Sequence, residues 1–203
     1  MNTNKRTLWI AQVSIFAAVE LIFCFTPLGS LPITPGIVAT LAHLPAIVAA
    51  LALGYSAAAI LGAVMGLSAL IVWTFMPPTP IVAFVFSPVY PGGNVFSALI
   101  TVVPRVLFPL VVVFLFRLSR KKLPLIPSAV MAAAGGTLAH SAMVLSAIYL
   151  AFHGNAVVGG DFINFVIAWG GVNALMEIIV AIIAAAGVII PLSKLNRPGG
   201  EEL

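Results

Sequence analysis

The sequence predicts an all-α integral membrane protein, a bundle of six transmembrane helices, on three observations. Only 7% of the 203 residues are Asp, Glu, Lys or Arg, whereas 62% are hydrophobic. The mean hydropathy is +1.21. Apolar runs long enough to cross the ~30 Å hydrocarbon layer recur along the chain. A soluble protein needs charged residues to cover its surface, so we expect lipid to be the solvent for most of this one.

The six expected spans cover residues 8–25, 37–53, 56–75, 97–118, 127–150 and 163–190. The second and third meet at the short segment Gly54-Tyr55-Ser56, whose last residue begins the third span, and this predicts a tight helical hairpin. The sequence contains no repeat of fixed period. We therefore expect residues 1–203 to form a single transmembrane domain.

The positions of the basic residues predict the orientation. Eight of the nine lie in short polar segments beside the apolar runs: Lys5, Arg6, Arg117, Arg120, Lys121, Lys122, Lys194 and Arg197. Placing the N-terminus inside brings all eight to the cytoplasmic side, as the positive-inside rule requires. The sequence thus predicts a multi-pass plasma-membrane protein with both termini in the cytoplasm, and it gives no reason to expect nucleic acid as a partner.

With this topology, three segments face outward: residues 26–36, 76–96 and 151–162. The first two are rich in proline, which fixes φ, and in glycine, which permits tight reversals. We expect ordered loops that form lids. The alternative is that proline and glycine simply end the helices at the membrane interface.

Three charged residues fall inside the expected spans: Glu20, Arg105 and Glu177. A charge at mid-bilayer costs roughly 2.5–3.5 kcal/mol, so each needs a partner or a function. Arg105 is expected in the outer half of the fourth span, the same half as His43 and His140. Arg105 could instead pair with Glu177 or Glu20 and hold helices together. For Glu20, a structural role is favoured over ligand contact.

Two spans carry polar stripes at four-residue spacing, which is the spacing of one helix face. The sixth span carries Phe165, Trp169, Asn173 and Glu177, and the fourth carries Ser97, Thr101 and Arg105. If these faces meet, they line an outward-opening cavity with aromatic, hydrogen-bonding and cationic groups. Such a cavity suits a small organic molecule with a carboxylate.

The candidate substrate-binding residues are Arg105, Asn173, Trp169, Asn94, Thr101, His43, His140 and Glu177. The two histidines could equally form hydrogen bonds between helices, and no spacing of carboxylates with them predicts a metal site. We expect no metal and no cofactor. No nucleophile elbow, zinc-binding helix or phosphate-binding loop is present, and the single cysteine has no base beside it. The chain is therefore not expected to be an enzyme, and ATP hydrolysis would require another polypeptide.

Small residues on the first span predict a docking face. Ser14 and Ala18 have the small-x-x-x-small spacing that lets helices approach closely, and Ala11 lies on a related face. These residues could instead pack within the bundle.

Four segments in this order carry a resemblance: TPLGSLPITPGIVATLAHLPAIVAALALG, AAAILGAVMGLSALI, GNVFSALITVVPRVLFPLV and GGVNALMEIIVAIIA. They resemble the substrate-binding S-components of energy-coupling factor (ECF) vitamin transporters over most of residues 8–190. The resemblance implies a six-helix subunit that captures a vitamin from outside, beneath its outward loops. It also implies three partners: a transmembrane coupling subunit and two cytoplasmic ATPases. Small residues of the first helix would touch the coupling subunit, although Ser14 departs from the alanine usual there.

The chain looks most like the branch that serves pantothenate, folate and related vitamins. Pantothenate is the favoured substrate because it has one carboxylate with hydroxyl and amide groups, and folate is expected to require more aromatic stacking. Folate and other vitamins remain alternatives. A second function is a secondary transporter driven by an ion gradient, because Glu20, Arg105 and Glu177 could relay ions. A third is a non-transporting assembly factor, whose polar stripes only join helices.

Overall fold

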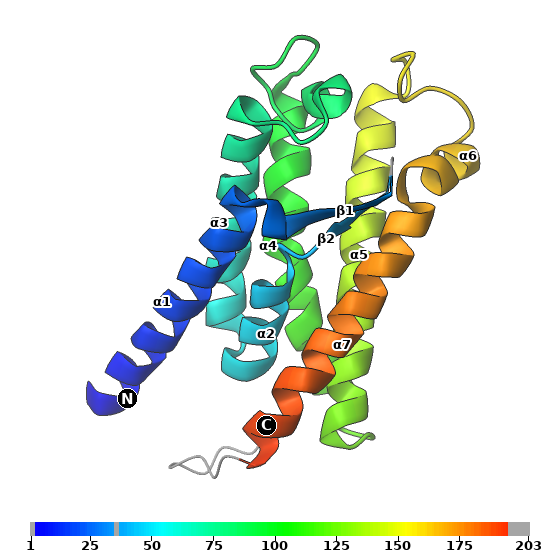
Figure 1. Cartoon of the computed structure of the whole chain (residues 1–203). Helices are drawn as coiled ribbons and strands as arrows, with labels where there is room; N and C mark the ends of the chain where they lie inside the picture. The colour runs from blue at the N-terminus through cyan, green and yellow to red at the C-terminus, as the bar shows by residue number, and fades with distance from the viewer. Residues whose placement is uncertain (1–2, 35–36, 195–203) are drawn as a thin grey trace.

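The computed structural model describes residues 3–34 and 37–194, which form a bundle of long helices (Figure 1). The long helices are α1 (Thr3–Phe25), α3 (Tyr55–Phe75), α4 (Val95–Ser119), α5 (Leu125–Phe152) and α7 (Val172–Lys194). Helix α7 is continuous with α6 (Phe162–Val166) through a π-helical turn over Ile167–Gly171. The described residues thus include five helical segments long and apolar enough to cross a bilayer, and the protein is a multi-pass membrane protein.

The second expected span differs from the prediction. Only Leu44–Leu53 are helical there, as α2, and ten residues rise about 15 Å, half of the hydrocarbon thickness. The prediction of helix from residue 37 was wrong, because Ile37–Thr40 form strand β2. An apolar run of this length does not by itself separate strand from helix.

Strand β2 pairs antiparallel with β1 (Ser30–Thr34), which forms a short hairpin within the predicted helical fold. A 3₁₀ turn over Pro27–Gly29 connects α1 to the hairpin. Ser30 pairs with Thr40, and the register shifts between Pro32 and Thr34. Proline has no N–H to donate, which is compatible with a short two-stranded sheet of this kind. The hairpin continues into α2 and packs beside α7.

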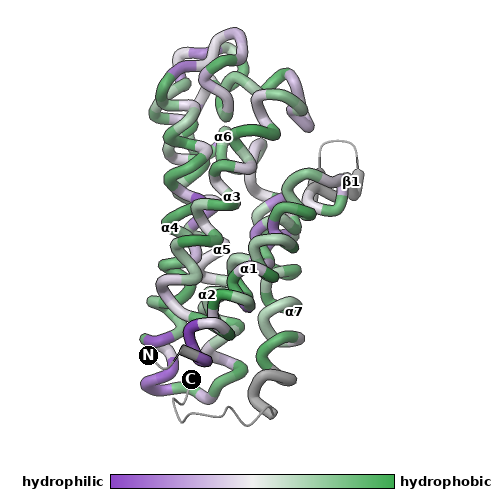
Figure 2. Tube along the Cα trace, turned by 90° about the vertical axis from the view of Figure 1, so that its left-hand side faces the viewer, coloured by the Kyte–Doolittle hydropathy of each residue, from purple (hydrophilic) through white to green (hydrophobic). Residues whose placement is uncertain are grey.

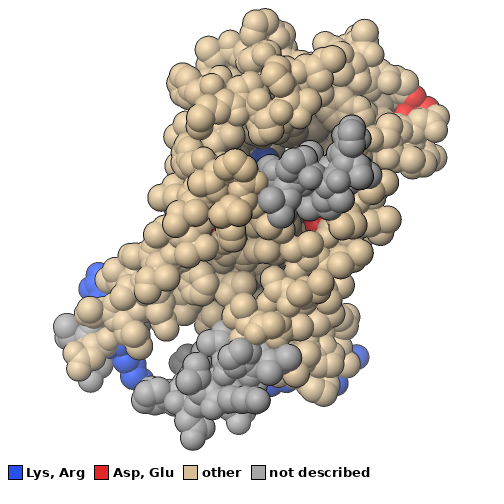
Figure 3. Space-filling view, in the orientation of Figure 1, with Lys and Arg blue, Asp and Glu red and all other residues tan. Residues whose placement is uncertain are grey.

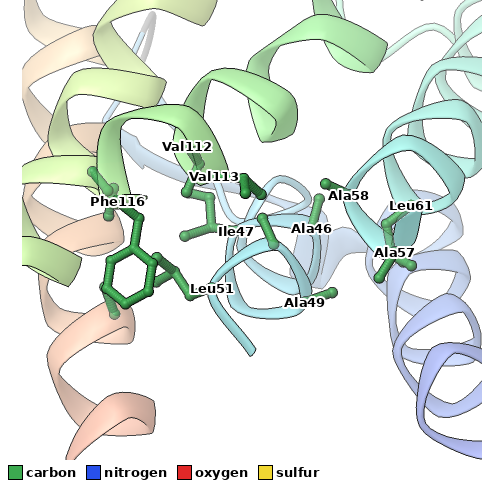
Figure 4. Packing of buried hydrophobic residues seen from close by; sticks show 14 of the residues in the cluster. Ala46, Ile47, Ala49, Leu51, Ala57, Ala58, Leu61, Val112, Val113 and Phe116 are labelled. Atoms are coloured by element: carbon green, nitrogen blue, oxygen red, sulfur yellow. The ribbon is translucent and has the colours of Figure 1, made fainter. Parts of the chain in front are cut away.

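The short helix α2 lies in the core of the bundle (Figure 4). Ala46 and Ile47 are 0% exposed, and Leu51 is also buried. Val112 and Phe116 of α4 pack near them, and Ala58 lies on the α3 side. A helix apolar on all faces belongs in the interior. Helix α2 therefore fills the centre of the bundle instead of contacting lipid.

Helices α3 and α4 approach closely because α3 carries glycines on the face toward α4. A Cβ built at Gly62 would lie 2.6 Å from the backbone oxygen of Arg105, and one at Gly66 would lie 3.2 Å from Cα of Val102. Only glycine therefore fits at position 62 without a backbone shift. This close packing fixes the height and rotation of α4 where it carries Arg105.

The two termini lie at the same end of the bundle, which we call the terminal end, and the other end is the distal end (Figure 1). The turn between α4 and α5, which holds Arg120, Lys121 and Lys122, also lies at the terminal end. Figure 2 shows hydrophilic stretches beside the N label, and Figure 3 shows Lys and Arg atoms gathered at the same end. Arg197 lies outside the described residues.

Candidate functional site

A cavity of about 460 Å³ opens toward the distal half of the bundle. Figure 3 shows a hollow on this side of the molecule, with basic side-chain atoms visible in it. Small-molecule sites in proteins typically measure roughly 300–1,000 Å³. The cavity has the size expected for one small organic ligand.

The cavity collects side chains from segments that are distant in the sequence. Its lining comes from the start of α2, from α3, α4, α5 and α7, and from the segment that connects α3 to α4. Six of the eight residues singled out as substrate-binding candidates line it: His43, Arg105, His140, Trp169, Asn173 and Glu177. The structure therefore brings most of these residues to one place. Their contact with a ligand stays a prediction.

Arg105 is the cationic residue among those that line the cavity. Its Nη1 donates a hydrogen bond of 2.6 Å to the carbonyl oxygen of Thr101, one turn earlier in α4. Its Cζ lies 5.9 Å from the ring centroid of Phe86, within the range of a cation–π contact. Among the described residues, its Nε has no hydrogen-bond partner. A buried guanidinium with an unused N–H can bind a carboxylate.

The two histidines both lie close to one phenylalanine, Phe108. The ring centroid of Phe108 is 6.4 Å from that of His43 and 5.0 Å from that of His140. Phe108 is 0% exposed, so both imidazoles pack against a buried ring. Nε2 of His140 is buried and has no hydrogen-bond partner among the described residues. Two imidazoles thus supply groups that can donate or accept hydrogen bonds at this end of the cavity.

The stripe expected on the last span is divided by the π-helical turn. Trp169, Asn173 and Glu177 line the cavity. Phe165 instead is buried in a separate apolar cluster and touches Trp169 at 5.2 Å between ring centroids. The wider π turn adds a residue to the helix between these positions and so changes which side chains share a face.

The stripe expected on α4 also divides. The hydroxyl of Ser97 donates to the carbonyl of Phe84 at 2.7 Å, and that of Thr101 lies 2.7 Å from the carbonyl of Phe86. Both acceptors belong to the segment between α3 and α4, where Pro80–Val85 form a 3₁₀ helix. These hydroxyls therefore attach that segment to α4, and Arg105 alone of the stripe lines the cavity.

Asn94 lies at the N-cap of α4. Its side chain accepts a hydrogen bond of 2.8 Å from the N–H of Phe96, and the hydroxyl of Ser97 accepts one of 3.1 Å from the N–H of Asn94. This reciprocal pair is a capping box. Asn94 does not line the cavity, and the observed contacts give its side chain a structural function.

Several residues in the lining were not found from the sequence. They include Trp73 on α3, and Thr79 and Val82 in the segment before α4. Trp73 and Phe86 lie 4.5 Å apart between ring centroids. Their position could have been suggested by the aromatic residues of the expected outward segment 76–96, because an apolar side chain in a loop is expected to pack against another part of the protein.

Glu20 and the small residues of α1 lie away from the cavity lining. Glu20 is 0% exposed and lies inside the bundle, and its structural role stays a prediction. Ala11, Ser14 and Ala18 are exposed, whereas Val13 and Glu20, on another face of the helix, are buried. The small-residue face is therefore not part of the packing within this chain. Its contact with a partner stays a prediction.

A second hollow, of about 690 Å³, lies between α4 and α5. Its lining is apolar apart from Ser146, and many of its side chains are exposed, including Leu99 and Leu150. It holds none of the candidate residues and no charged group. It is larger, but it lacks the polar groups that fix the orientation of a soluble ligand, so the smaller cavity is the better candidate.

Comparison with known proteins adds to this geometry. No family model matches the chain. The chain is 29% identical over 195 residues to the pantothenic acid transporter PanT of Lactococcus lactis subsp. cremoris (strain MG1363). The alignment covers 91% of this chain and 93% of that protein. Its fold matches the structure of ThiT from Listeria monocytogenes with a TM-score of 0.58 at 19% identity, over 94% of this chain and 98% of that one.

Both alignments extend over almost the whole chain, so they apply to the complete bundle and include the cavity. The fold, the apolar spans and the relative agree with the resemblance drawn from the sequence motifs. The relative to which the chain is similar is named as a transporter and not as an enzyme. The chain is thus similar to a pantothenic acid transporter over almost its whole length, and it shares its fold with ThiT.

Proposed function

We propose that the chain is an S-component of an ECF vitamin transporter, which captures pantothenate from outside the cell and delivers it for ATP-driven uptake. One observation carries the proposal: a cavity of about 460 Å³ is lined by a buried arginine together with imidazole, amide and aromatic side chains. The named relative is a pantothenic acid transporter, which makes this vitamin the first to test.

The chemistry of pantothenate suits the lining. Its carboxylate would bind the guanidinium of Arg105, whose Nε has no partner among the described residues. Its hydroxyl and amide groups would meet His43, His140 and Asn173. Its branched methyl groups would contact the aromatic rings of the lining. Each functional group of the vitamin thus has a candidate partner, which supports pantothenate over a ligand without a carboxylate.

The proposed orientation has both termini in the cytoplasm and the cavity open to the outside. The Lys and Arg residues at the terminal end support it through the positive-inside rule. The sixth membrane segment would be the β1–β2 hairpin together with α2, since α2 alone is too short to cross the bilayer. Residues 1–203 would act as one substrate-binding domain.

The proposed partners are the transmembrane coupling subunit and two cytoplasmic ATPases of the ECF module. The exposed small-residue face of α1, with Ala11, Ser14 and Ala18, is the proposed contact with the coupling subunit. Helix α1 is the least buried of the long helices: 11% of the residues in its apolar 18-residue stretch are buried, against 44% in α4. Such a helix has a large surface left for a partner.

The test is equilibrium binding of radiolabelled pantothenate, folate and thiamin to the purified full-length chain in detergent. Selective, submicromolar binding of pantothenate is expected. Tighter binding of folate would replace the substrate but keep the capture function. If none of the three binds, and the chain alone accumulates a vitamin in vesicles under an ion gradient, the protein is a secondary transporter.

A further inference from the structure

The last span contains one turn of π-helix, which lies between α6 and α7 at the level of the cavity. It covers Ile167–Gly171. A π turn carries one residue more than an α-helical turn, and such turns are rare and frequently lie at functional sites. Ile167 and Ala168 are exposed, Trp169 is half-buried and Gly170 is buried. The turn thus separates residues that face outward from residues that face the cavity, and its presence requires a structural explanation.

The two ends of this span are held independently. At the distal end, the side chain of Asp161 caps α6 by accepting two backbone N–H groups at 3.0 and 3.3 Å. Phe165 is buried beside Tyr149 of α5, with 5.6 Å between the ring centroids. Toward the terminal end, Ala181 and Ala185 of α7 are 0% exposed and belong to the core. These contacts fix the rotation of α6 and of α7 separately, and the extra residue joins the two.

Within the turn, two adjacent residues have different neighbours. Trp169 lines the cavity together with Asn173, which follows in α7. Gly170 packs against α5, where a Cβ would lie 2.3 Å from Cδ1 of Leu145. Because Leu145 itself lines the cavity, any larger residue at position 170 would push this side chain out of place. The order of tryptophan and glycine therefore fits only one register of the helix.

A helix with one residue fewer before α7 would have a different register. If the residue were lost after Gly170, Trp169 would move into the place of Gly170. The indole does not fit there, because even a methyl group is too close to Leu145. Ala168 would take the place of Trp169, and the cavity would lose the indole. The extra residue therefore decides which side chain faces the cavity.

We infer that the π-helical turn positions Trp169 for ligand binding: its extra residue keeps Trp169 in the cavity and Gly170 against α5, while Phe165 packs outside the cavity. The effect on affinity rests on the proposed function, in which aromatic rings of the lining contact the methyl groups of pantothenate. Buried tryptophans often contribute a large share of the binding free energy at a site. The turn acts on the ligand through Trp169.

Two deletions of one residue separate the position of Trp169 from that of α6. Deletion of Gly171 and deletion of Ala168 each remove the extra residue and shift α6 by one position. Only deletion of Gly171 also moves Trp169 relative to α7, because deletion of Ala168 leaves the order from Trp169 to Val172 unchanged. Gly171→Ala is the control without a deletion, since a Cβ there meets nothing within 4 Å. Pantothenate binding is measured for each full-length protein.

Deletion of Gly171 should weaken pantothenate binding about tenfold or more, the scale usual for loss of a buried tryptophan contact. Deletion of Ala168 and Gly171→Ala should stay within about threefold of the wild type. Adding Trp169→Ala to the Gly171 deletion should cause no further loss, because the indole has already left the cavity. Added to the Ala168 deletion, it should cause the full loss. A deletion that only destabilised the protein would not produce this non-additivity.

A second measurement needs no ligand. Trp169→Cys is introduced together with Cys24→Ala, which removes the single natural cysteine. A charged thiol reagent should then label the new thiol in the full-length protein and after deletion of Ala168. It should not label the thiol after deletion of Gly171, because the side chain would face α5. Failure of the wild type to bind pantothenate would contradict the proposed function alone, and the labelling still decides the position of residue 169.

Equal affinities of the two deletion variants, whether unchanged or equally weakened, would overturn the inference, as would equal labelling of the two. If either deletion prevents folding, Gly170→Ala is compared with Gly171→Ala. The first should weaken binding, because the new methyl displaces Leu145, and the second should not. Equal affinities of these two variants would also overturn the inference.

Discussion

The guanidinium of Arg105 lies 5.9 Å from the ring centroid of Phe86, so the cation of the cavity is in contact with the segment that connects α3 to α4. Arg105 comes from the middle of α4, and Phe86 comes from outside the helices. The same segment is attached to α4 through Ser97 and Thr101. A ligand bound at Arg105, as proposed, would therefore be coupled to the position of this segment.

Substituting Arg105→Ala should weaken pantothenate binding by about 2–5 kcal/mol, because a desolvated carboxylate would lose its charged partner. Isothermal titration calorimetry of the purified chain measures the change. Arg117→Ala is the control, since Arg117 is exposed near the terminal end and its Cζ contacts Tyr55 at 4.8 Å. A folded Arg105→Ala protein with wild-type affinity would exclude the proposed contact.

Substituting Thr101→Val should leave the carbonyl of Phe86 without this donor, which costs about 1–3 kcal/mol for a buried group. We expect a lower unfolding temperature and faster dissociation of bound pantothenate, because the segment covering Arg105 is less firmly held. The dissociation rate is measured by adding excess unlabelled pantothenate and following the loss of bound radiolabelled ligand.

The matched control for this change is Thr137→Val. Thr137 is also buried, at 1% exposed, but its hydroxyl has no hydrogen-bond partner among the described residues. Replacing it should be neutral or stabilising, because an unsatisfied buried hydroxyl is removed. Equal effects of both substitutions would mean that the Thr101 hydroxyl does not hold the segment.

Substituting Gly62→Ala should destabilise the protein by about 1–3 kcal/mol, the usual cost of overpacking. The new Cβ would lie 2.6 Å from the backbone oxygen of Arg105, so α3 and α4 must separate. The displacement of Arg105 should also weaken ligand binding. Thermal unfolding and titration are compared with Gly187→Ala, where a Cβ meets nothing within 4 Å. Similar behaviour of the two variants would argue against the close approach.

Substituting Ala18→Trp should abolish ATP-driven uptake in cells that supply the coupling subunit and ATPases, while pantothenate binding by the isolated chain is retained. The bulky ring blocks close helix contact on the exposed small-residue face. Val19→Trp, on a neighbouring exposed position, is the control and should keep more activity. Loss of binding in Ala18→Trp would instead indicate that α1 contributes to folding of the cavity.

The sequence by itself determined that this protein lies in a lipid bilayer, and it gave the approximate positions of the long helices. Charge content and apolar run length decide these properties, and both are local quantities. The four-residue spacing also identified Trp169, Asn173 and Glu177 as neighbours, because periodicity fixes which residues share a helix face. Arg105 was identified as a candidate residue because placing a charged side chain within the membrane costs free energy.

The tertiary structure decided which faces meet. The spacing along α4 places Ser97, Thr101 and Arg105 on one helix face and so predicts that all three line the cavity. Only the fold shows that the two hydroxyls instead form hydrogen bonds with carbonyl groups of the segment before α4. The contact of Phe108 with two histidines depends on three segments at once. The short length of α2 follows from the strand pairing of the residues that precede it. Such contacts join residues distant in the chain, and no local pattern encodes them.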